Sequence, residues 1–190
     1  MKKVFIDGSQ GTTGLKIFDR LKKRDDIELL TLPDELRKDV DSRKEALNSA
    51  DIAFLCLPDA AAIEAAELVT NDDTVIIDTS TAHRTSEGWA YGFPEIFKDG
   101  FETVASSKRI ASPGCYASGF TALVKPLLDE GIVSPDHGFI CHAVSGYSGA
   151  GKKGIAMYES DEKAPELFAP REYALNQEHK HLKEMRKISG

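Results

Sequence analysis

VFIDGSQGTTGLKIF, residues 4–18, joins a short apolar run to a segment with helical spacing through three glycines. The β-branched and aromatic residues before Gly8 are typical of a buried strand. Apolar side chains then recur at near-helical spacing from Leu15 to Leu21, which favours a helix. The stretch therefore predicts a strand, a tight turn and a helix, in that order.

The three glycines form the pattern G-x-x-G-x-x-G. Gly8 suits a tight turn, Gly11 lets backbone N–H groups approach a pyrophosphate, and Gly14 permits close packing of the helix on the strand. Because this spacing differs from the common G-x-G-x-x-G, the pattern alone is a weak signal for a nucleotide site. Its position between a predicted strand and a predicted helix favours a dinucleotide site over a turn without a ligand. We expect the cofactor to be bound by Gly8, Ser9, Gly11, Thr12, Thr13 and Gly14.

Strand-like and helix-like segments continue to alternate after this unit. The sequence predicts a helix over residues 60–70 and strands within residues 26–32, 50–58 and 74–80. The run at 50–58 is apolar almost throughout, as expected for a central parallel strand covered on both faces. This alternation predicts an α/β fold with a doubly wound, mostly parallel sheet of the Rossmann type.

The segment PDELRKD, residues 33–39, follows the second predicted strand. In an NAD enzyme an acidic residue near this point usually binds the ribose 2′-hydroxyl. Arg37 and Lys38 can meet a 2′-phosphate instead, so we favour NADP as the cofactor. Asp34 and Glu35 leave NAD open, and a solvated charged loop is the alternative without any ligand.

The segment DTSTAHR, residues 78–84, follows the last of these predicted strands. Ligands of open α/β sheets gather at the carboxyl ends of the strands. We therefore expect Ser80 to lie at the cofactor and Arg84 on the substrate side, where a guanidinium can bind phosphate or carboxylate in a bidentate way. The alternative for Arg84 is a solvated surface charge.

RIASPGCYASGF, residues 109–120, holds a cysteine directly after Pro-Gly and before a predicted helix. A helix N-terminus carries about half a positive charge and favours the thiolate form of a cysteine there. We therefore predict Cys115 as a nucleophile. The alternative is an inert, buried thiol, which we predict for Cys56 and consider plausible for Cys141 in the strand-like GFICHAV, residues 138–144. We expect Pro126 to bend or end the helix.

A nucleophilic cysteine also needs an acid or base nearby. The segment YALNQEHKHLKEM, residues 173–185, brings His179, His181 and Glu184 together near a predicted helix start. The sequence does not decide which histidine meets Cys115. A surface helix with solvated histidines is the alternative.

Composition narrows the class of protein. The chain has 190 residues, 41% hydrophobic and 29% charged, with a net charge of −7. The negative charge argues against nucleic-acid binding, which requires a basic surface. No apolar stretch approaches the ~20 residues of a membrane span, and no signal peptide or metal-binding pattern is present. Three widely spaced cysteines make no disulfide framework, so we expect a cytoplasmic protein.

Six ordered motifs resemble a known family. They are DGSQGTTGLKI, DTSTAHR, YGFPE, SPGCYASG, AVSGYSGAGKK and NQEHKHLKE, and together they span nearly the whole chain. The chain resembles the N-acetyl-gamma-glutamyl-phosphate reductases in their shorter bacterial form, which are related to aspartate-semialdehyde dehydrogenases. The resemblance implies that Cys115 is the catalytic nucleophile and His179 the catalytic acid/base. It implies substrate-side roles for Arg84, Ser145, Gly146, Tyr147, Ser148, Tyr173, His181 and Glu184.

The resemblance also implies a reaction, the NADPH-dependent reduction of N-acetyl-glutamyl 5-phosphate to the 5-semialdehyde, with release of phosphate, through a cysteine thioester. This is a step of arginine biosynthesis. A related acyl-phosphate reductase, such as aspartate-semialdehyde dehydrogenase, or an inactive nucleotide-binding fragment is the alternative. We expect an NADP-binding domain over residues 1–114. Over residues 115–190 we expect the beginning of an α+β catalytic domain like that of glyceraldehyde-3-phosphate dehydrogenase, truncated at its C-terminus, and a homo-oligomer for the full-length protein.

Overall fold

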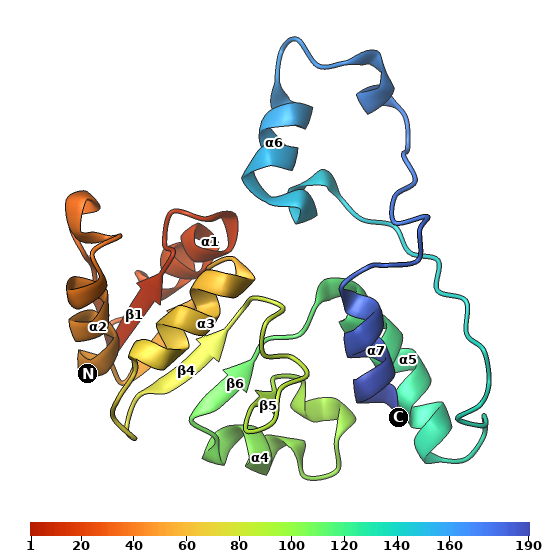
Figure 1. Ribbon diagram of the computed structural model, residues 1–190, viewed down its shortest axis with the longest axis horizontal. Helices are drawn as coiled ribbons and strands as arrows, with labels where there is room; N and C mark the ends of the chain where they lie inside the picture. Colours follow the sequence, from red (N-terminus) through yellow and green to blue (C-terminus); the bar gives the residue numbers. More distant parts are fainter.

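A computed structural model describes residues 1–190 and contains one six-stranded sheet (Figure 1). All neighbouring strands are parallel, in the order β2-β1-β3-β4-β6-β5. The strands are β1 (Lys2–Asp7), β2 (Ile27–Leu30), β3 (Ile52–Leu55), β4 (Val75–Asp78), β5 (Ala90–Tyr91) and β6 (Arg109–Ala111). The helices are α1 (Thr12–Leu21), α2 (Val40–Ser49), α3 (Asp59–Leu68), α4 (Gly100–Ser106), α5 (Cys115–Asp129), α6 (Gly151–Glu159) and α7 (His181–Ser189).

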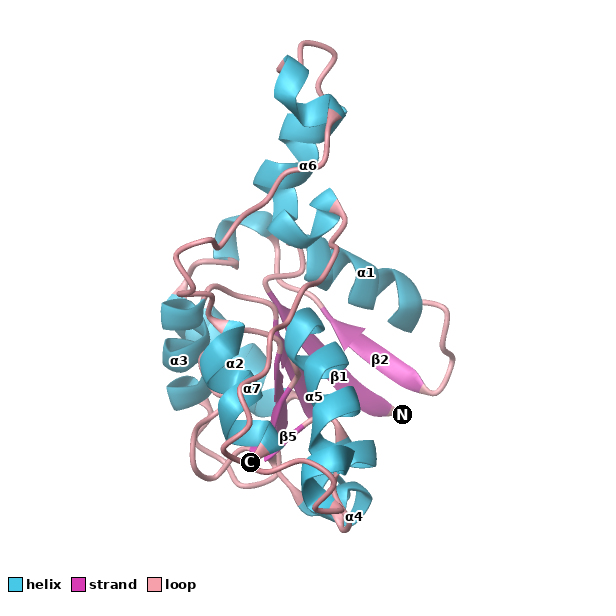
Figure 2. Cartoon of the chain, turned by 90° about the vertical axis from the view of Figure 1, so that its right-hand side faces the viewer, coloured by secondary structure: helices cyan, strands magenta, loops and turns pink.

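The predicted doubly wound α/β sheet is confirmed. Strands β1 to β4 and helices α1 and α3 lie where the sequence predicts them. Helix α1 lies on one face of the sheet, whereas α2 and α3 lie on the other (Figure 2). Strand β1 pairs with β2 on one side and with β3 on the other, so the strand order reverses beside β1. In open α/β sheets the ligand crevice lies at such a switch point.

The main apolar core lies between the sheet and the α2–α3 layer. Its nine buried residues come from these helices, from the residue that follows each of them, and from three strands. Five are fully buried: Leu47, Ala53, Leu55, Ala65 and Ile76. Small residues on α3 allow close approach, because Ala62 and Ala65 expose none of their surface. Helix α2 begins where Asp39 accepts a hydrogen bond from the backbone N–H of Ser42 at 2.8 Å, a standard N-cap.

From α5 onward the structure bears on two expectations, those for Pro126 and for Cys141. Helix α5 runs through Pro126 to Asp129, so the proline does not end it. Residues 138–144 form no strand, and Cys141 is exposed, so the expectation of a buried thiol there is wrong. The alternation of GFICHAV required a sheet neighbour, and residues 115–190 contain helices and no strand that supplies one. No helix of the chain has the length and apolar character needed to cross a membrane.

Candidate nucleotide cleft and active site

The glycine turn lies at the switch point of the sheet. Gly8 has a φ of +84°, and a Cβ there would lie 2.3 Å from the carbonyl oxygen of Cys56. The N–H of Gly11 donates to the carbonyl of Gly8 at 2.9 Å, and α1 begins at the next residue. A Cβ on Gly14 would lie 2.4 Å from the Gly8 oxygen. The tight turn and the close helix packing are therefore both present, while pyrophosphate binding stays a prediction.

A cleft of about 1030 Å³ opens beside this turn. Its walls include Gly8, Ser9 and Gln10 from the turn, and Arg37 and Lys38 from the segment after β2. The size suits a bound small molecule. The cleft and the glycine turn together fit the adenosine and phosphate parts of a dinucleotide, because Gly8 and Gly11 carry no side chain and α1 begins directly after the turn.

A buried ion pair that sequence analysis missed forms one wall of the cleft. Arg43 of α2 donates from Nε and Nη2 to Oδ2 of Asp7 at 3.1 and 2.9 Å. Burial raises the pKa of Asp7, against the lowering effect of the Arg43 hydrogen bonds. The only sequence signal for this ion pair was Asp7, the acidic residue at the end of the first predicted strand. The pair ties α2 to the residue that precedes Gly8.

Cys115 is the first residue of α5, and its side chain is exposed. The N–H of Gly114, just before it, donates to Oε1 of Glu184 at 2.8 Å. The hydroxyl of Tyr91 donates to the same oxygen at 2.7 Å. Burial and this hydrogen bond raise the pKa of Tyr91. Glu184, a predicted substrate-side residue, therefore lies buried at the N-terminus of the cysteine helix.

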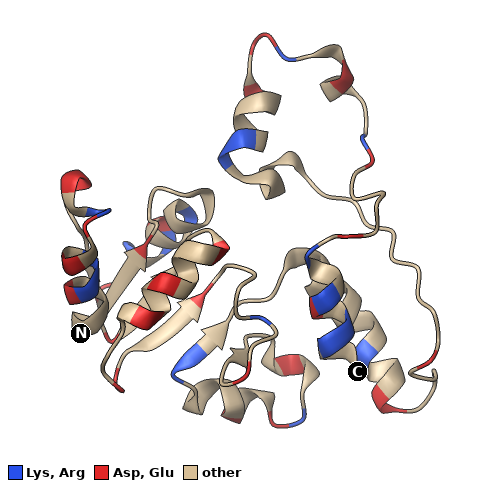
Figure 3. Cartoon of the chain, in the orientation of Figure 1, with Lys and Arg blue, Asp and Glu red and all other residues tan.

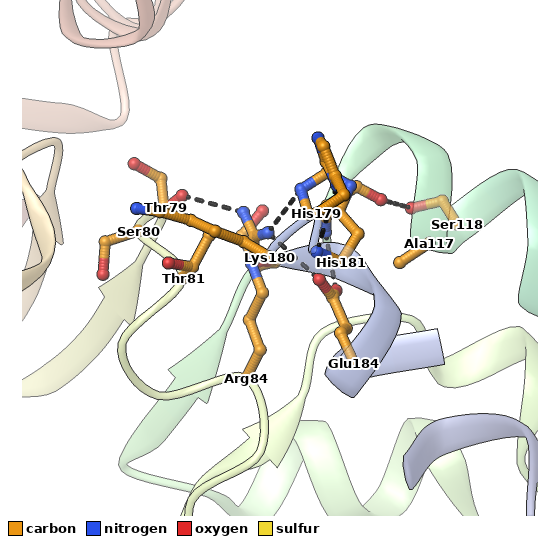
Figure 4. A network of polar contacts seen from close by, with 12 residues as sticks. Thr79, Ser80, Thr81, Arg84, Ala117, Ser118, His179, Lys180, His181 and Glu184 are labelled. Carbon is orange, nitrogen blue, oxygen red and sulfur yellow. Dashed lines mark hydrogen bonds and ion pairs between the residues drawn. The ribbon is translucent and has the colours of Figure 1, made fainter. Parts of the chain in front are cut away.

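Arg84 completes this buried network (Figure 4). Its guanidinium donates to Glu184 at 3.1 Å, to the carbonyl of Ser112 at 2.8 Å and to the carbonyl of Thr79 at 3.2 Å. Its Nη1 also lies 3.2 Å from Nε2 of His181. The predicted substrate-side Arg84 is thus neither solvated nor free, because its donors already have acceptors within the chain.

His181 is the first residue of α7 and lies against Gly114. A Cβ on Gly114 would lie 2.5 Å from Nε2 of His181 and 2.6 Å from Nη1 of Arg84. Burial lowers the pKa of His181, with Glu184 opposing and Arg84 assisting this shift. Because Nε2 faces the Arg84 donor, the neutral ring carries its proton on Nδ1, which is buried without a partner.

His179 belongs to an aromatic group beside Cys115. The Tyr116 ring centroid lies 5.5 Å from that of His179 and 5.8 Å from that of His181. The hydroxyl of Tyr173 donates to the hydroxyl of Tyr116. Partial burial, this hydrogen bond and the charge of Cys115 raise the pKa of Tyr173 to about 12. The structure thus brings both predicted histidines and Tyr173 to the N-terminus of α5.

Lys180, between the two histidines, contacts the start of α3. Its Nζ donates to Asp59, at the start of α3, at 2.7 Å. The same carboxylate accepts hydrogen bonds from the N–H and the hydroxyl of Thr81. Although partial burial acts in the opposite direction, the hydrogen bonds from Lys180 and Thr81 lower the pKa of Asp59 to about 2. No sequence pattern pointed to this pair.

Ser80 is held within the loop after β4. Its hydroxyl donates to Asp78 at 2.7 Å, and Nδ1 of His83 lies 2.6 Å from the same carboxylate. The His83 ring stacks on Trp89 with centroids 3.9 Å apart. Ser80 is buried and bound to Asp78 within the loop that carries Arg84, and its contact with the cofactor stays a prediction.

Residues 145–148 lie apart from Cys115. They precede α6, and Figures 1 and 2 both show α6 projecting away from α5 and α7. Tyr147 instead stacks on Tyr158 and donates a hydrogen bond to Glu159 at 2.9 Å. The predicted substrate-side residues Ser145, Gly146, Tyr147 and Ser148 are therefore not brought to the cysteine in this structure.

Cys56 follows β3 and is mostly buried. Burial raises the pKa of its thiol to about 11. The raised pKa agrees with the predicted inert thiol, whose lack of reactivity stays a prediction. The carbonyl of Cys56 forms the floor beneath Gly8.

The doubly wound sheet, the glycine turn at its switch point and the adjoining cleft define an α/β dinucleotide-binding protein with a cysteine at the mouth of a neighbouring helix. Two family models match it: "Semialdehyde dehydrogenase, NAD binding domain" over residues 35–104, and "Semialdehyde dehydrogenase, dimerisation domain" over residues 115–190. The chain belongs to the semialdehyde dehydrogenase family.

The chain is similar to several N-acetyl-gamma-glutamyl-phosphate reductases. One from Chelativorans sp. (strain BNC1) is 52% identical over 185 residues, which is 97% of this chain and 59% of that protein. N-acetyl-gamma-glutamyl-phosphate reductase 2 of Pseudomonas putida is 49% identical, over 98% of this chain and 59% of that protein. The resemblance found in the sequence is confirmed. The chain spans about three fifths of the length of these relatives.

Solved structures agree on the fold. Aspartate semialdehyde dehydrogenase II from Vibrio cholerae matches with a TM-score of 0.61 at 18% identity, over 100% of this chain and 66% of that one. Aspartate semialdehyde dehydrogenase from Francisella tularensis matches with a TM-score of 0.57 at 18% identity, over 83% of this chain and 48% of that one.

Proposed function

We propose that this chain provides the nucleotide-binding and cysteine-bearing parts of an N-acetyl-gamma-glutamyl-phosphate reductase. The enzyme reduces N-acetyl-glutamyl 5-phosphate to the 5-semialdehyde with release of phosphate, in arginine biosynthesis. The observation that carries the proposal is the assembly of two histidines, Glu184 and Arg84 around the helix N-terminus at Cys115. The names of relatives at 47–52% identity support the substrate.

The chemistry follows from the residues at α5. The Sγ of Cys115 attacks the acyl carbon, the bond from that carbon to the phosphate oxygen breaks, and phosphate leaves a thioester behind. A bound nicotinamide nucleotide supplies hydride for the reduction. His179 donates a proton toward the oxygen on which negative charge develops, and takes it back as the Cys115 C–S bond breaks and the aldehyde leaves. Such acid–base assistance contributes ~10²–10⁴-fold.

The two histidines offer different environments for that proton. His181 is buried against Arg84, which favours its neutral form, whereas His179 is half-buried among aromatic rings. A neutral ring is a poorer proton donor than an imidazolium, which supports His179 as the acid. The contacts of His181 with Arg84 and Gly114 support a different role for it, in which the ring positions the start of α5.

Substitution of the cysteine and histidines tests the mechanism. We expect Cys115→Ser to abolish reduction while nucleotide binding is unchanged, and His179→Asn to lose at least 100-fold in kcat without loss of folding. Phosphate-dependent oxidation of N-acetylglutamate semialdehyde, compared with aspartate semialdehyde, reports both activity and substrate. Normal turnover by Cys115→Ser would overturn the nucleophile. If kcat falls more in His181→Asn than in His179→Asn, the acid/base role belongs to His181.

For the cofactor, we propose NADP, with Arg37 and Lys38 at the 2′-phosphate. What supports this proposal is that both side chains line the cleft beside the glycine turn; the family model, described as an NAD binding domain, supports a nicotinamide nucleotide in general. We expect Arg37→Ala with Lys38→Ala to weaken NADPH binding at least tenfold more than NADH binding, because each charged contact to phosphate contributes about 1.5–3 kcal/mol. Fluorescence titration of bound nucleotide measures both. Equal losses for the two nucleotides would contradict the assignment.

We further propose a cytoplasmic homo-oligomer. The three free cysteines suit a reducing compartment, and the match of residues 115–190 to a dimerisation domain supports self-association.

A further inference from the structure

Arg37, the cation assigned to the cofactor, is already bound by acceptors of the chain. Its Nη2 lies 2.6 Å from Oδ1 of Asp34, and its Nε lies 3.4 Å from the carbonyl of Leu32. The amide of Gln10, oriented with its oxygen toward the guanidinium, accepts from Nη1 at 2.9 Å. The guanidinium is therefore oriented in advance at the wall of the cleft.

Asp34 occupies the edge of this guanidinium that a phosphate would use. Asp34 and Arg37 both line the cleft, and the acidic turn lies directly before the basic pair at residues 37–38 (Figure 3). The Asp34 side chain is 82% exposed and that of Arg37 34% exposed. Exposed ion pairs contribute little to stability. When another anion displaces the Asp34 carboxylate from Arg37, the free energy of unfolding therefore falls only slightly.

The two partners recognise different ribose groups. A carboxylate accepts a hydrogen bond from a ribose 2′-hydroxyl and repels a 2′-phosphate. A guanidinium binds the phosphate in a bidentate way and gains little from the hydroxyl. Asp34 and Arg37 present both possibilities at one position of the cleft, 2.6 Å apart. Lys38 lines the same cleft without an ion pair and adds a charge that favours phosphate.

We propose that the Asp34–Arg37 pair determines cofactor specificity by exchange of partners. With a 2′-hydroxyl ligand the pair stays closed and Asp34 accepts a hydrogen bond from the hydroxyl. With a 2′-phosphate ligand Arg37 leaves Asp34 for the phosphate, and Asp34 turns toward solvent. The site thus accepts both kinds of dinucleotide and prefers the phosphorylated one. This inference rests on the proposed function in one respect, that the cleft binds the adenosine half of the cofactor.

Asp34→Asn tests the exchange with two simple probes, adenosine 2′,5′-bisphosphate and 5′-AMP, whose affinities are measured by calorimetry. We expect the bisphosphate to bind about 3–10-fold more tightly, because a like charge has been removed. We expect 5′-AMP to bind about 2–5-fold more weakly, because a charged acceptor has been lost. Arg37→Met should instead weaken binding of the bisphosphate more than binding of 5′-AMP.

Glu35→Gln is the matched control, since Glu35 lies in the same turn, forms no ion pair and does not line the cleft. It should leave the ratio of the two affinities unchanged. Equal shifts in Asp34→Asn and Glu35→Gln would show an effect of net charge and overturn the proposal, as would parallel changes of both probes in Asp34→Asn. If the unsubstituted chain binds neither probe, the assignment of the cleft itself fails. Far-UV circular dichroism confirms folding, and Asp34→Ser provides a second variant.

Discussion

Glu184 joins three distant segments through one carboxylate. It accepts hydrogen bonds from the N–H of Gly114, the hydroxyl of Tyr91 and the guanidinium of Arg84, and it is 2% exposed. A buried carboxylate without partners is strongly destabilising, by several kcal/mol. The three donors offset that cost, and in doing so they fix α7 against the start of α5.

Tyr91→Phe isolates one of these three donors. The variant keeps the ring and its packing, and it leaves Glu184 with two donors. We expect the free energy of unfolding to fall by about 1–3 kcal/mol, the cost of an unmet buried partner, measured by urea denaturation. Tyr158→Phe is the control, because the Tyr158 ring stacks on Tyr147 and its hydroxyl makes no hydrogen bond. Equal losses in the two variants would show that the hydroxyl of Tyr91 adds nothing.

Single residues differ in how far the sequence predicts them. The positions of Gly8 and Cys115 were predictable because the chemistry that defines them is local: a turn after a strand, and a helix that begins at the residue. The surroundings of Arg84 were not. Its partners are Ser112, 28 residues away, and Glu184, 100 residues away, and no local pattern encodes such contacts.

Among the elements, α7 depends on the ionisation of its first residue. His181 packs on Gly114 in the neutral form, with Arg84, Glu184, His179 and Lys180 as its charged or titratable neighbours. The pKa of His181 is lower in the folded chain than its ordinary value of about 6.5. At pH values between the folded pKa and the ordinary one, the unfolded chain therefore binds a proton that the folded chain does not bind. This stabilising contribution is full above the ordinary pKa and is lost as pH falls through the folded pKa.

The expected outcome is a decrease in the free energy of unfolding between pH 7.5 and pH 5.5 that is larger in the unsubstituted chain than in His181→Gln. Glutamine keeps a neutral polar side chain at the position, so it removes the proton linkage and keeps most of the packing. His137→Gln, at an exposed position, should retain the full pH dependence. If His181→Gln has the same pH dependence as the unsubstituted chain, the linkage belongs to other groups. Chemical denaturation at each pH provides the measurement.

Element prediction succeeded where hydrophobic patterns were long enough. Strands β1, β3 and β4 belong to continuous apolar runs, which are typical of parallel strands covered on both faces. Strands β5 and β6 have two and three residues, so their patterns are too short to detect. Helix α2, VDSRKEALNS, is largely polar, and only Arg43, Ala46 and Leu47 are buried. Its packing on α3 could not be predicted from so weak a pattern.

Across the whole molecule, the core leaves out a long segment of the chain. Every buried hydrophobic residue lies within residues 4–124, except Met185 of α7. Residues 131–180 expose large apolar side chains, including Ile140 at 99% and Val144 at 93%. The end of this segment contacts the rest through Tyr173 and His179, which both contact Tyr116, and through Lys180, which binds Asp59. The sheet, the cleft and the α5–α7 pair therefore form a unit that does not depend on α6.

Replacing residues 136–170 by a flexible Gly/Ser linker tests that independence. The deletion keeps Tyr173, Lys180 and all of α7, and it removes exposed apolar surface that promotes aggregation. We expect the free energy of unfolding to change by less than about 1 kcal/mol. The deletion removes no buried hydrophobic residue and only one aromatic contact, that of the partly exposed Phe139 with Phe120, and loop-closure entropy depends only weakly on length. The affinity for adenosine 2′,5′-bisphosphate should stay within about twofold. If the variant unfolds or no longer binds the nucleotide, α6 stabilises the cleft and the proposed independence is wrong. Figure 1 shows α6 projecting away from the sheet, so we expect neither result.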